Sequence, residues 1–234
     1  MEFTRRNKPT TILLPLIFLA MGFLSCTLIL KEHTVSTQQV MKELSLQELN
    51  KTTAGGVVKE GNPKSVEQDG VAAVEFDGAH DGLFLPENPA AHLWQFTVEV
   101  LFRPAAKAPH EQRFLHFGEA QGDRMLIETR VTEDDQWYLD AFIKSGESSA
   151  TLIDPEKKHP TGVWYHVALV VDNGAMDTYV NGNHELSGKV VFTPFAGGTA
   201  SIGVRMNKIS WFKGAISKVR ITPRCLRPNE FMKK

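Results

Sequence analysis

The strongest constraint on the fold is a series of short apolar segments, separated by turn residues, that begins after Gly70. The clearest segment covers residues 95–103, where every second side chain from Phe96 to Phe102 is apolar and most positions between them are polar or charged. Alternation with a period of two is typical of an antiparallel strand that is buried on one face. The pattern therefore predicts an all-β domain.

Two further segments predict a hairpin. Residues 163–171 are apolar at nearly every position, which is typical of a strand covered on both faces, and the run ends at Asp172-Asn173-Gly174. The next run, residues 175–180, ends at Asn181-Gly182. Asparagine and glycine tolerate the positive φ of tight turns, so we expect the chain to reverse at both places.

Three motifs resemble those of a known family. They are VEFDGAHDGLFLP within residues 73–86, TGVWYHVALVVDNGAMDTYVNG at 161–182 and IGVRMNKISWFKGAISKVRI at 202–221. In this order they are similar to the opening, hairpin and closing elements of laminin G-like domains, and residues 226–231 resemble the helical turn that follows. The resemblance implies a concanavalin A-like fold over residues 71–234, that is, two antiparallel sheets in a jelly-roll sandwich. Because the run at 163–171 is apolar on both faces, we expect Trp164 to pack in the core and His166 to be a core histidine hydrogen-bonded to backbone.

The N-terminal region predicts export. Residues 11–30 carry no charge and follow Arg5, Arg6 and Lys8. At ~1.5 Å per residue a helix of this length crosses a bilayer core. The positive-inside rule makes residues 1–10 a short cytoplasmic tail and places the domain in the periplasm or at the cell exterior, as in a bacterial membrane-anchored protein. A cleaved signal peptide and a lipoprotein, with Cys26 as the candidate lipidation site, are the alternatives.

Residues 31–70 predict a polar stalk or linker, because they include no Phe, Trp or Tyr and are rich in polar side chains. The chain has two cysteines, too few for a disulfide framework, so core packing must hold the domain together. Its formal net charge is −1, which argues against nucleic acid as a partner because phosphate backbones attract strongly basic surfaces.

The sequence shows no pattern of catalytic carboxylates. Glucanases of the same fold place acidic residues at even spacing on one strand, as in E-x-D-x-x-E, whereas Glu99 is alone on its predicted strand. Residues 133–135 are acidic but are predicted to form a hairpin turn between residues 124–132 and 136–143. We therefore expect no catalytic residue, and we expect that the chain is not an enzyme.

No metal ligand or cofactor is predicted either. Calcium-binding relatives carry acidic residues just before the closing V-R-I strand, where this chain has Ser217 and Lys218. Residues 172–174 leave a calcium site open, although turn formation explains them fully.

Carbohydrate binding is the ligand chemistry that the remaining residues favour. Trp137 and Trp211 adjoin a turn and a loop, where an aromatic face can stack on a sugar, and Arg130 or Arg205 can orient its hydroxyl groups. The sequence thus predicts a non-catalytic extracytoplasmic module that recognises carbohydrate or protein. The alternatives are a structural domain of a cell-envelope assembly and, less favoured, a glycoside hydrolase.

Overall fold

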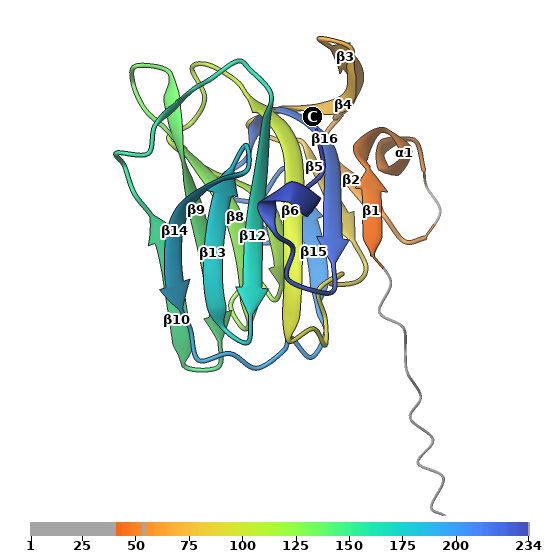
Figure 1. Cartoon of the computed structure of the whole chain (residues 1–234). Coiled ribbons are helices and arrows are strands. Elements are labelled where there is room, and N and C mark those ends of the chain that lie inside the picture. Colours follow the sequence, from red (N-terminus) through yellow and green to blue (C-terminus); the bar gives the residue numbers. More distant parts are fainter. Residues whose placement is uncertain (1–40, 53–54, 234) are drawn as a thin grey trace, which may run out of the picture. The chain divides into compact units, whose positions relative to one another are not determined.

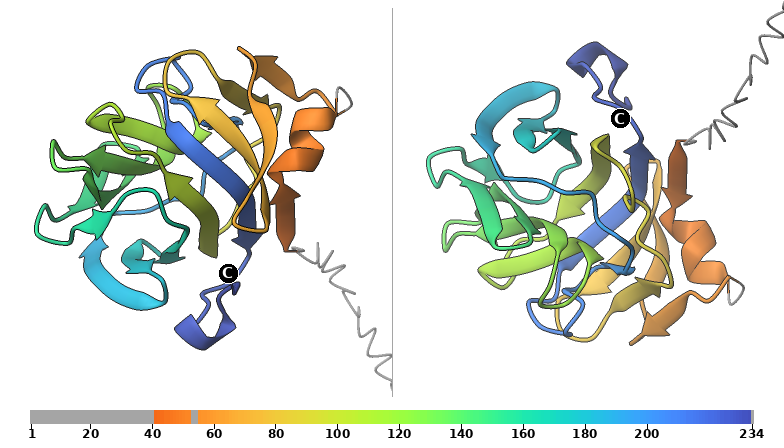
Figure 2. Two further views of the ribbon diagram at one scale, coloured as in Figure 1. Left: turned by 90° about the horizontal axis from the view of Figure 1, so that it is seen from above. Right: turned by 90° about the horizontal axis from the view of Figure 1, so that it is seen from below.

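The computed structural model describes residues 41–52 and 55–233 of the 234-residue chain. This part forms two antiparallel β-sheets packed face to face, which Figure 1 shows from the side and Figure 2 from both ends. The predicted all-β, two-sheet jelly-roll sandwich is confirmed.

We call the first layer sheet A. Its strands follow the order β14-β13-β12-β6-β16-β4-β3, and β1 also pairs with β16. Their bounds are β1 (Lys42–Ser45), β3 (Lys64–Gln68), β4 (Val71–Asp77), β6 (Gln95–Pro104), β12 (Tyr165–Asp172), β13 (Ala175–Val180), β14 (Asn183–Lys189) and β16 (Lys213–Thr222).

The second layer, sheet B, follows the order β10-β9-β8-β7-β15-β5-β2, with β11 paired to β9. Its strands are β2 (Val58–Glu60), β5 (Gly82–Leu85), β7 (Glu111–Gly118), β8 (Arg124–Val131), β9 (Gln136–Ser145), β10 (Ser148–Ile153), β11 (His159–Pro160) and β15 (Thr199–Ile202). Two short helices complete the described chain, α1 (Leu46–Lys51) and the 3-10 turn η1 (Pro228–Glu230).

The predicted strands and hairpin are present. From Phe96 to Phe102 the alternate apolar side chains of β6 are fully buried between the sheets. The strand β12 pairs antiparallel with β13, and Asn173 and Gly174 adopt φ of 48° and 94° at the turn. The second turn has φ of 52° at Asn181 and leads into β14.

Much of the predicted stalk belongs to the folded domain. The strand β1 pairs with residues 218–221 of β16, and β3 pairs with β4. Leu46 is fully buried in the main core, and Leu44 and Leu49 pack against it. Residues 42–51, 58–60 and 64–68, which the sequence assigns to the stalk, therefore form a helix and strands of the domain. Both β1 and β3 belong to sheet A but bury few of their side chains, so their composition is polar.

The N-terminal predictions concern residues that are not described. The apolar segment 11–30 and Cys26 lie outside residues 41–52 and 55–233. Within those two ranges, no helix has both the length and the apolar composition that a membrane span requires.

The structure places two tryptophans differently from their predicted positions. Trp137 is fully buried, with its ring 5.1 Å from that of Phe102 and 4.9 Å from that of Tyr165. Trp164 is only half-buried, and its Nε1 donates a hydrogen bond to the Gln68 carbonyl oxygen at 3.2 Å. Tyr165 and the following odd-numbered residues of β12 face the core, so Trp164 falls on the other side. The prediction of a core Trp164 is wrong.

Candidate binding site

The end of the chain covers part of the outer face of sheet A. Residues 223–233, which we call the C-terminal strap, cross this face and include η1, the dark-blue turn in front of β12 in Figure 1. Leu226 and Phe231 of the strap pack against Ala168 and Val170 of β12. This contact explains why β12 is apolar on both faces, as its sequence predicts.

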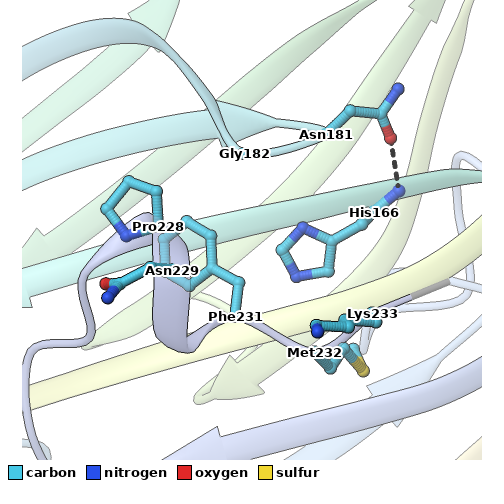
Figure 3. A pocket seen from close by; sticks show the side chains of 8 residues that line it. All are labelled: His166, Asn181, Gly182, Pro228, Asn229, Phe231, Met232 and Lys233. Carbon is cyan, nitrogen blue, oxygen red and sulfur yellow. Dashed lines mark hydrogen bonds between the residues drawn. The ribbon is translucent and has the colours of Figure 1, made fainter.

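A pocket of about 340 Å³ lies beside the strap, and Figure 3 shows its lining. The backbone N–H of His166 donates a hydrogen bond to Asn181 Oδ1 at 3.1 Å. The buried carboxylate of Glu99 accepts hydrogen bonds from His166 Nε2 at 2.9 Å, Arg220 Nε at 2.6 Å and the Met232 N–H at 2.7 Å. These groups are engaged in anchoring the strap, so this pocket is the joint between strap and sheet. The sequence predicts that the His166 ring bonds to backbone, but the ring bonds the Glu99 carboxylate instead.

Sheet B carries a different pocket on its outer face, of about 230 Å³. Its side chains come from neighbouring strands and from the loop after β15. We call it the arginine pocket, and its lining residues are Arg113, Arg124, Leu126, Glu128, Arg130, Asp140, Phe142, Thr151 and Arg205.

Two carboxylates lie side by side in the arginine pocket. Glu128 of β8 is the register partner of Asp140 of β9, and each side chain is 3% exposed. Arg130 bridges them, with Nη2 3.3 Å from Glu128 Oε2 and Nε 3.0 Å from Asp140 Oδ2. Arg113 Nε donates to Glu128 Oε1 at 3.1 Å. The structure thus pairs two acidic side chains across strands.

Burial and the adjacent Asp140 raise the pKa of Glu128 to about 7, against the opposing effect of Arg113 and Arg130. Burial also raises the pKa of Asp140, even though Arg130 lowers it. Glu128 can therefore hold or release a proton near neutral pH, which is the property required of a general acid or base.

The predicted sugar-binding residues fall in three places. Arg130 and Arg205 both line the arginine pocket. Trp137 lies in the core and cannot present a stacking face, because it occupies an inward position on β9. Trp211 is half-buried in the loop before β16, where its ring lies near Gly82, and it does not line this pocket.

Four charged residues of the arginine pocket were not predicted. Arg113, Arg124, Glu128 and Asp140 line the pocket without having been singled out. The sequence did contain a signal, because charged residues occupy three of the four even-numbered positions of β8 while its odd-numbered positions are uncharged. That alternation marks an outer face with unusually many charges.

The turn at residues 172–174, where the sequence leaves a calcium site open, is held by hydrogen bonds among its own neighbours. Asp172 Oδ1 accepts hydrogen bonds from Gln95 Nε2 and Asn173 Nδ2, both at 2.7 Å. In the part of the chain that the structure describes, no group of three or more His, Cys, Asp and Glu side chains is arranged to hold a metal ion.

A family model for the concanavalin A-like lectin/glucanases superfamily matches residues 77–231. The chain belongs to this superfamily. The match spans the three motifs in part or in full, together with every strand that contributes to the arginine pocket. A comparison with curated proteins found no match.

Solved structures share the superfamily fold. Domain 4 of AbnA, a GH43 extracellular arabinanase from Geobacillus stearothermophilus determined in complex with arabinotriose, has a TM-score of 0.60 and 24% identity, over 80% of this chain and 94% of that one. The binding domain of botulinum neurotoxin DC, in complex with SialylT, has a TM-score of 0.53 and 17% identity, over 74% of this chain and 44% of that one.

A Trypanosoma rangeli sialidase in complex with the inhibitor DANA has a TM-score of 0.52 and 17% identity, over 73% of this chain and 28% of that one. At these identities the likenesses show the fold. Chains of glycoside hydrolases thus contain the concanavalin A-like sandwich, and the fold is compatible with a hydrolase. The prediction that this chain is not an enzyme is therefore overturned. It depended on a search for carboxylates along one strand, whereas Glu128 and Asp140 lie on two.

Proposed function

We propose that the domain binds a carbohydrate in the arginine pocket. The observation that carries the proposal is the mixed lining of this pocket, where charged hydrogen-bonding groups surround the apolar side chains of Leu126 and Phe142. Sugars present the same combination of hydroxyl groups and apolar ring faces. The superfamily and the arabinotriose complex of the AbnA domain support this choice of ligand class.

A glycan array probed with the full-length chain tests the proposal. Detergent is kept present because residues 11–30 are strongly apolar. The blocking variant is Thr151→Trp, because Thr151 is an exposed residue that lines the pocket, so a larger side chain there fills the site without entering the core. Glu67→Trp, at an exposed position of β3 in the other sheet, adds the same bulk elsewhere and is the control.

We expect the wild type and Glu67→Trp to bind the same glycans and Thr151→Trp to lose at least about tenfold in affinity, because the larger side chain excludes the ligand. Equal binding by both variants would place the site elsewhere. Absence of binding to any glycan would refute the proposal and favour a structural domain of an envelope assembly.

Glycoside hydrolysis is a second candidate function, and one observation favours it. The pKa of about 7 at Glu128, beside a second carboxyl group, matches a proton donor to a glycosidic oxygen that is paired with a base or nucleophile. The test is release of reducing ends from the glycans that bind.

We expect Glu128→Gln to reduce this release by about 10²-fold or more. Glu67→Gln, at the exposed position on β3, should leave it unchanged. Release that survives Glu128→Gln would exclude Glu128 as the proton donor, and no release from any bound glycan would exclude hydrolysis.

A further inference from the structure

The arginine pocket contains more cations than its carboxylates can pair with. Four arginines and two carboxylates line it. Arg113 and Arg130 form ion pairs with Glu128, and both also pair with Glu111 at the rim. Among residues 41–52 and 55–233, Arg124 and Arg205 form no ion pair.

Backbone carbonyls hold both unpaired arginines in place. Arg124 Nη1 donates to the Gln121 and Gly122 oxygens, each at 2.8 Å, and Arg205 Nη2 donates to the Ala120 oxygen at 3.3 Å. The Nε of each is buried without a hydrogen-bond partner. Burial, and then repulsion from Arg205 and Arg113, lowers the pKa of Arg124, and burial with repulsion from Arg113 lowers that of Arg205. Two cations therefore share a partly desolvated space, an arrangement that a bound anion would relieve.

The two loops behind these arginines are fixed to each other by a buried histidine. His116 lies on β7 and is fully buried, and its Nε2 donates to the Glu119 oxygen at 3.0 Å. Its Nδ1 accepts the Met206 N–H at 3.2 Å. One bond reaches the loop that holds Arg124, and the other reaches the loop that carries Arg205. The guanidinium groups are thus positioned before any ligand arrives.

A second unpartnered group points to a sugar instead of a bare anion. Asp140 is 2% exposed, and its Oδ1 has no hydrogen-bond partner although its Oδ2 is bound by Arg130. A buried carboxylate oxygen without a donor is costly, and a ligand hydroxyl group would supply that donor. Leu126 and Phe142 add apolar surface in the same pocket.

We propose that the arginine pocket binds a glycan through an anionic substituent, a carboxylate or a sulfate, which pairs with Arg124 and Arg205 while a neighbouring hydroxyl group donates to Asp140 Oδ1. This inference rests on the proposed carbohydrate binding and names its ligand class. Arginine suits the role because its planar guanidinium binds carboxylate and sulfate oxygens with two hydrogen bonds.

Matched pairs of glycans test the inference with the purified full-length chain in detergent. A galacturonic acid trisaccharide is compared with its methyl ester, and a sulfated N-acetylglucosamine with the unsulfated sugar. The two pairs distinguish carboxylate from sulfate. The variants are Arg124→Gln and Arg205→Gln, with Arg224→Gln as the control. Arg224 is an exposed strap residue paired with Glu230, so its substitution changes the net charge equally on the opposite face.

We expect the acidic member of at least one pair to bind about tenfold or more tightly than its neutral partner, the effect of one or more charge-assisted hydrogen bonds. Arg124→Gln and Arg205→Gln should each remove most of this preference, and Arg224→Gln should keep it. Melting temperatures identify any variant that fails to fold. If Arg124→Gln fails to fold, Arg124→Lys is used in its place, and because it keeps the charge it should retain part of the preference for the acidic glycan.

Neutral glycans that bind as tightly as acidic ones would overturn the anionic ligand and leave carbohydrate binding intact. A preference for acidic glycans that persists in both arginine variants would also overturn the inference, because Arg124 and Arg205 would then not bind the anionic group. Absence of binding to both probe pairs and to the glycan array would overturn carbohydrate binding itself.

Discussion

Replacing Glu99 by glutamine tests how the strap is held on sheet A. The Glu99 side chain is 0% exposed and accepts three hydrogen bonds, from His166, Arg220 and the Met232 N–H. Glutamine keeps the shape but removes the charge that Arg220, itself 15% exposed, needs as a partner. Breaking a buried ion pair costs about 3–5 kcal/mol, and we expect the lower end because the amide oxygen remains an acceptor. For a domain of this size that lowers the melting temperature by roughly 6–12 °C.

The pH dependence gives the same substitution a second readout. Burial alone would raise the pKa of Glu99, but the hydrogen bonds from His166 and Arg220 hold it below its ordinary value of 4.5. A lowered pKa contributes stability that is present above 4.5 and is lost as the pH falls through the folded-state value. The difference between wild type and Glu99→Gln, followed by thermal unfolding, should therefore be large at pH 7 and shrink below about pH 4.

Glu67→Gln, at an exposed site on β3, should melt like the wild type throughout. The reasoning is refuted if Glu99→Gln melts within about 2 °C of the wild type at pH 7, or if the difference is the same at pH 3 as at pH 7.

Two further substitutions test the core and the arginine pocket. Trp137→Ala should destabilise the domain by about 3–5 kcal/mol in denaturant unfolding, because Trp137 is fully buried. Trp94→Ala should cost little, because Trp94 is 53% exposed. Similar losses of stability in the two variants would contradict this packing. The pKa of Glu128 is about 7 in the folded chain and 4.5 in the unfolded chain, so the unfolded chain loses this proton at a lower pH than the folded chain. The free energy of unfolding should therefore fall by roughly 3 kcal/mol as the pH rises from 4.5 to 7. Glu128→Gln should show a much smaller decline in melting curves recorded across the range, because only the contribution from the raised pKa of Asp140 remains. A decline of unchanged size would exclude Glu128 as its main source.

The strands of the sandwich could be predicted because they leave local signals. Period-two alternation identified β6, and Asn-Gly turns identified the ends of β12 and β13. Alternation along β9 also predicts a buried Trp137, because the apolar residues Leu139, Ala141 and Ile143 lie on the same face of the strand and are buried like it. The prediction of a core Trp164 failed because a run that is apolar on both faces does not say which of its side chains point between the sheets.

Part of the site was predictable in principle. A hairpin turn at residues 133–135 was expected, and folding the chain back about Asp134 places Glu128 opposite Asp140, as the structure shows. The approach of Arg205 to these residues was not predictable by that route. It depends on the path of the loop after β15 and on the bonds of His116 to two loops, which involve residues far apart in sequence.

The position of β16 in sheet A has a consequence for synthesis of the protein. This strand lies between β6 and β4, yet it follows them in sequence by more than a hundred residues. Until residue 222 has left the ribosome, β4 and β6 each lack a neighbour and present an unpaired edge. Unpaired edges of apolar strands promote aggregation, and long-range pairing of this kind is slow. Efficient production should therefore depend on chaperones that hold the nascent chain until β16 emerges.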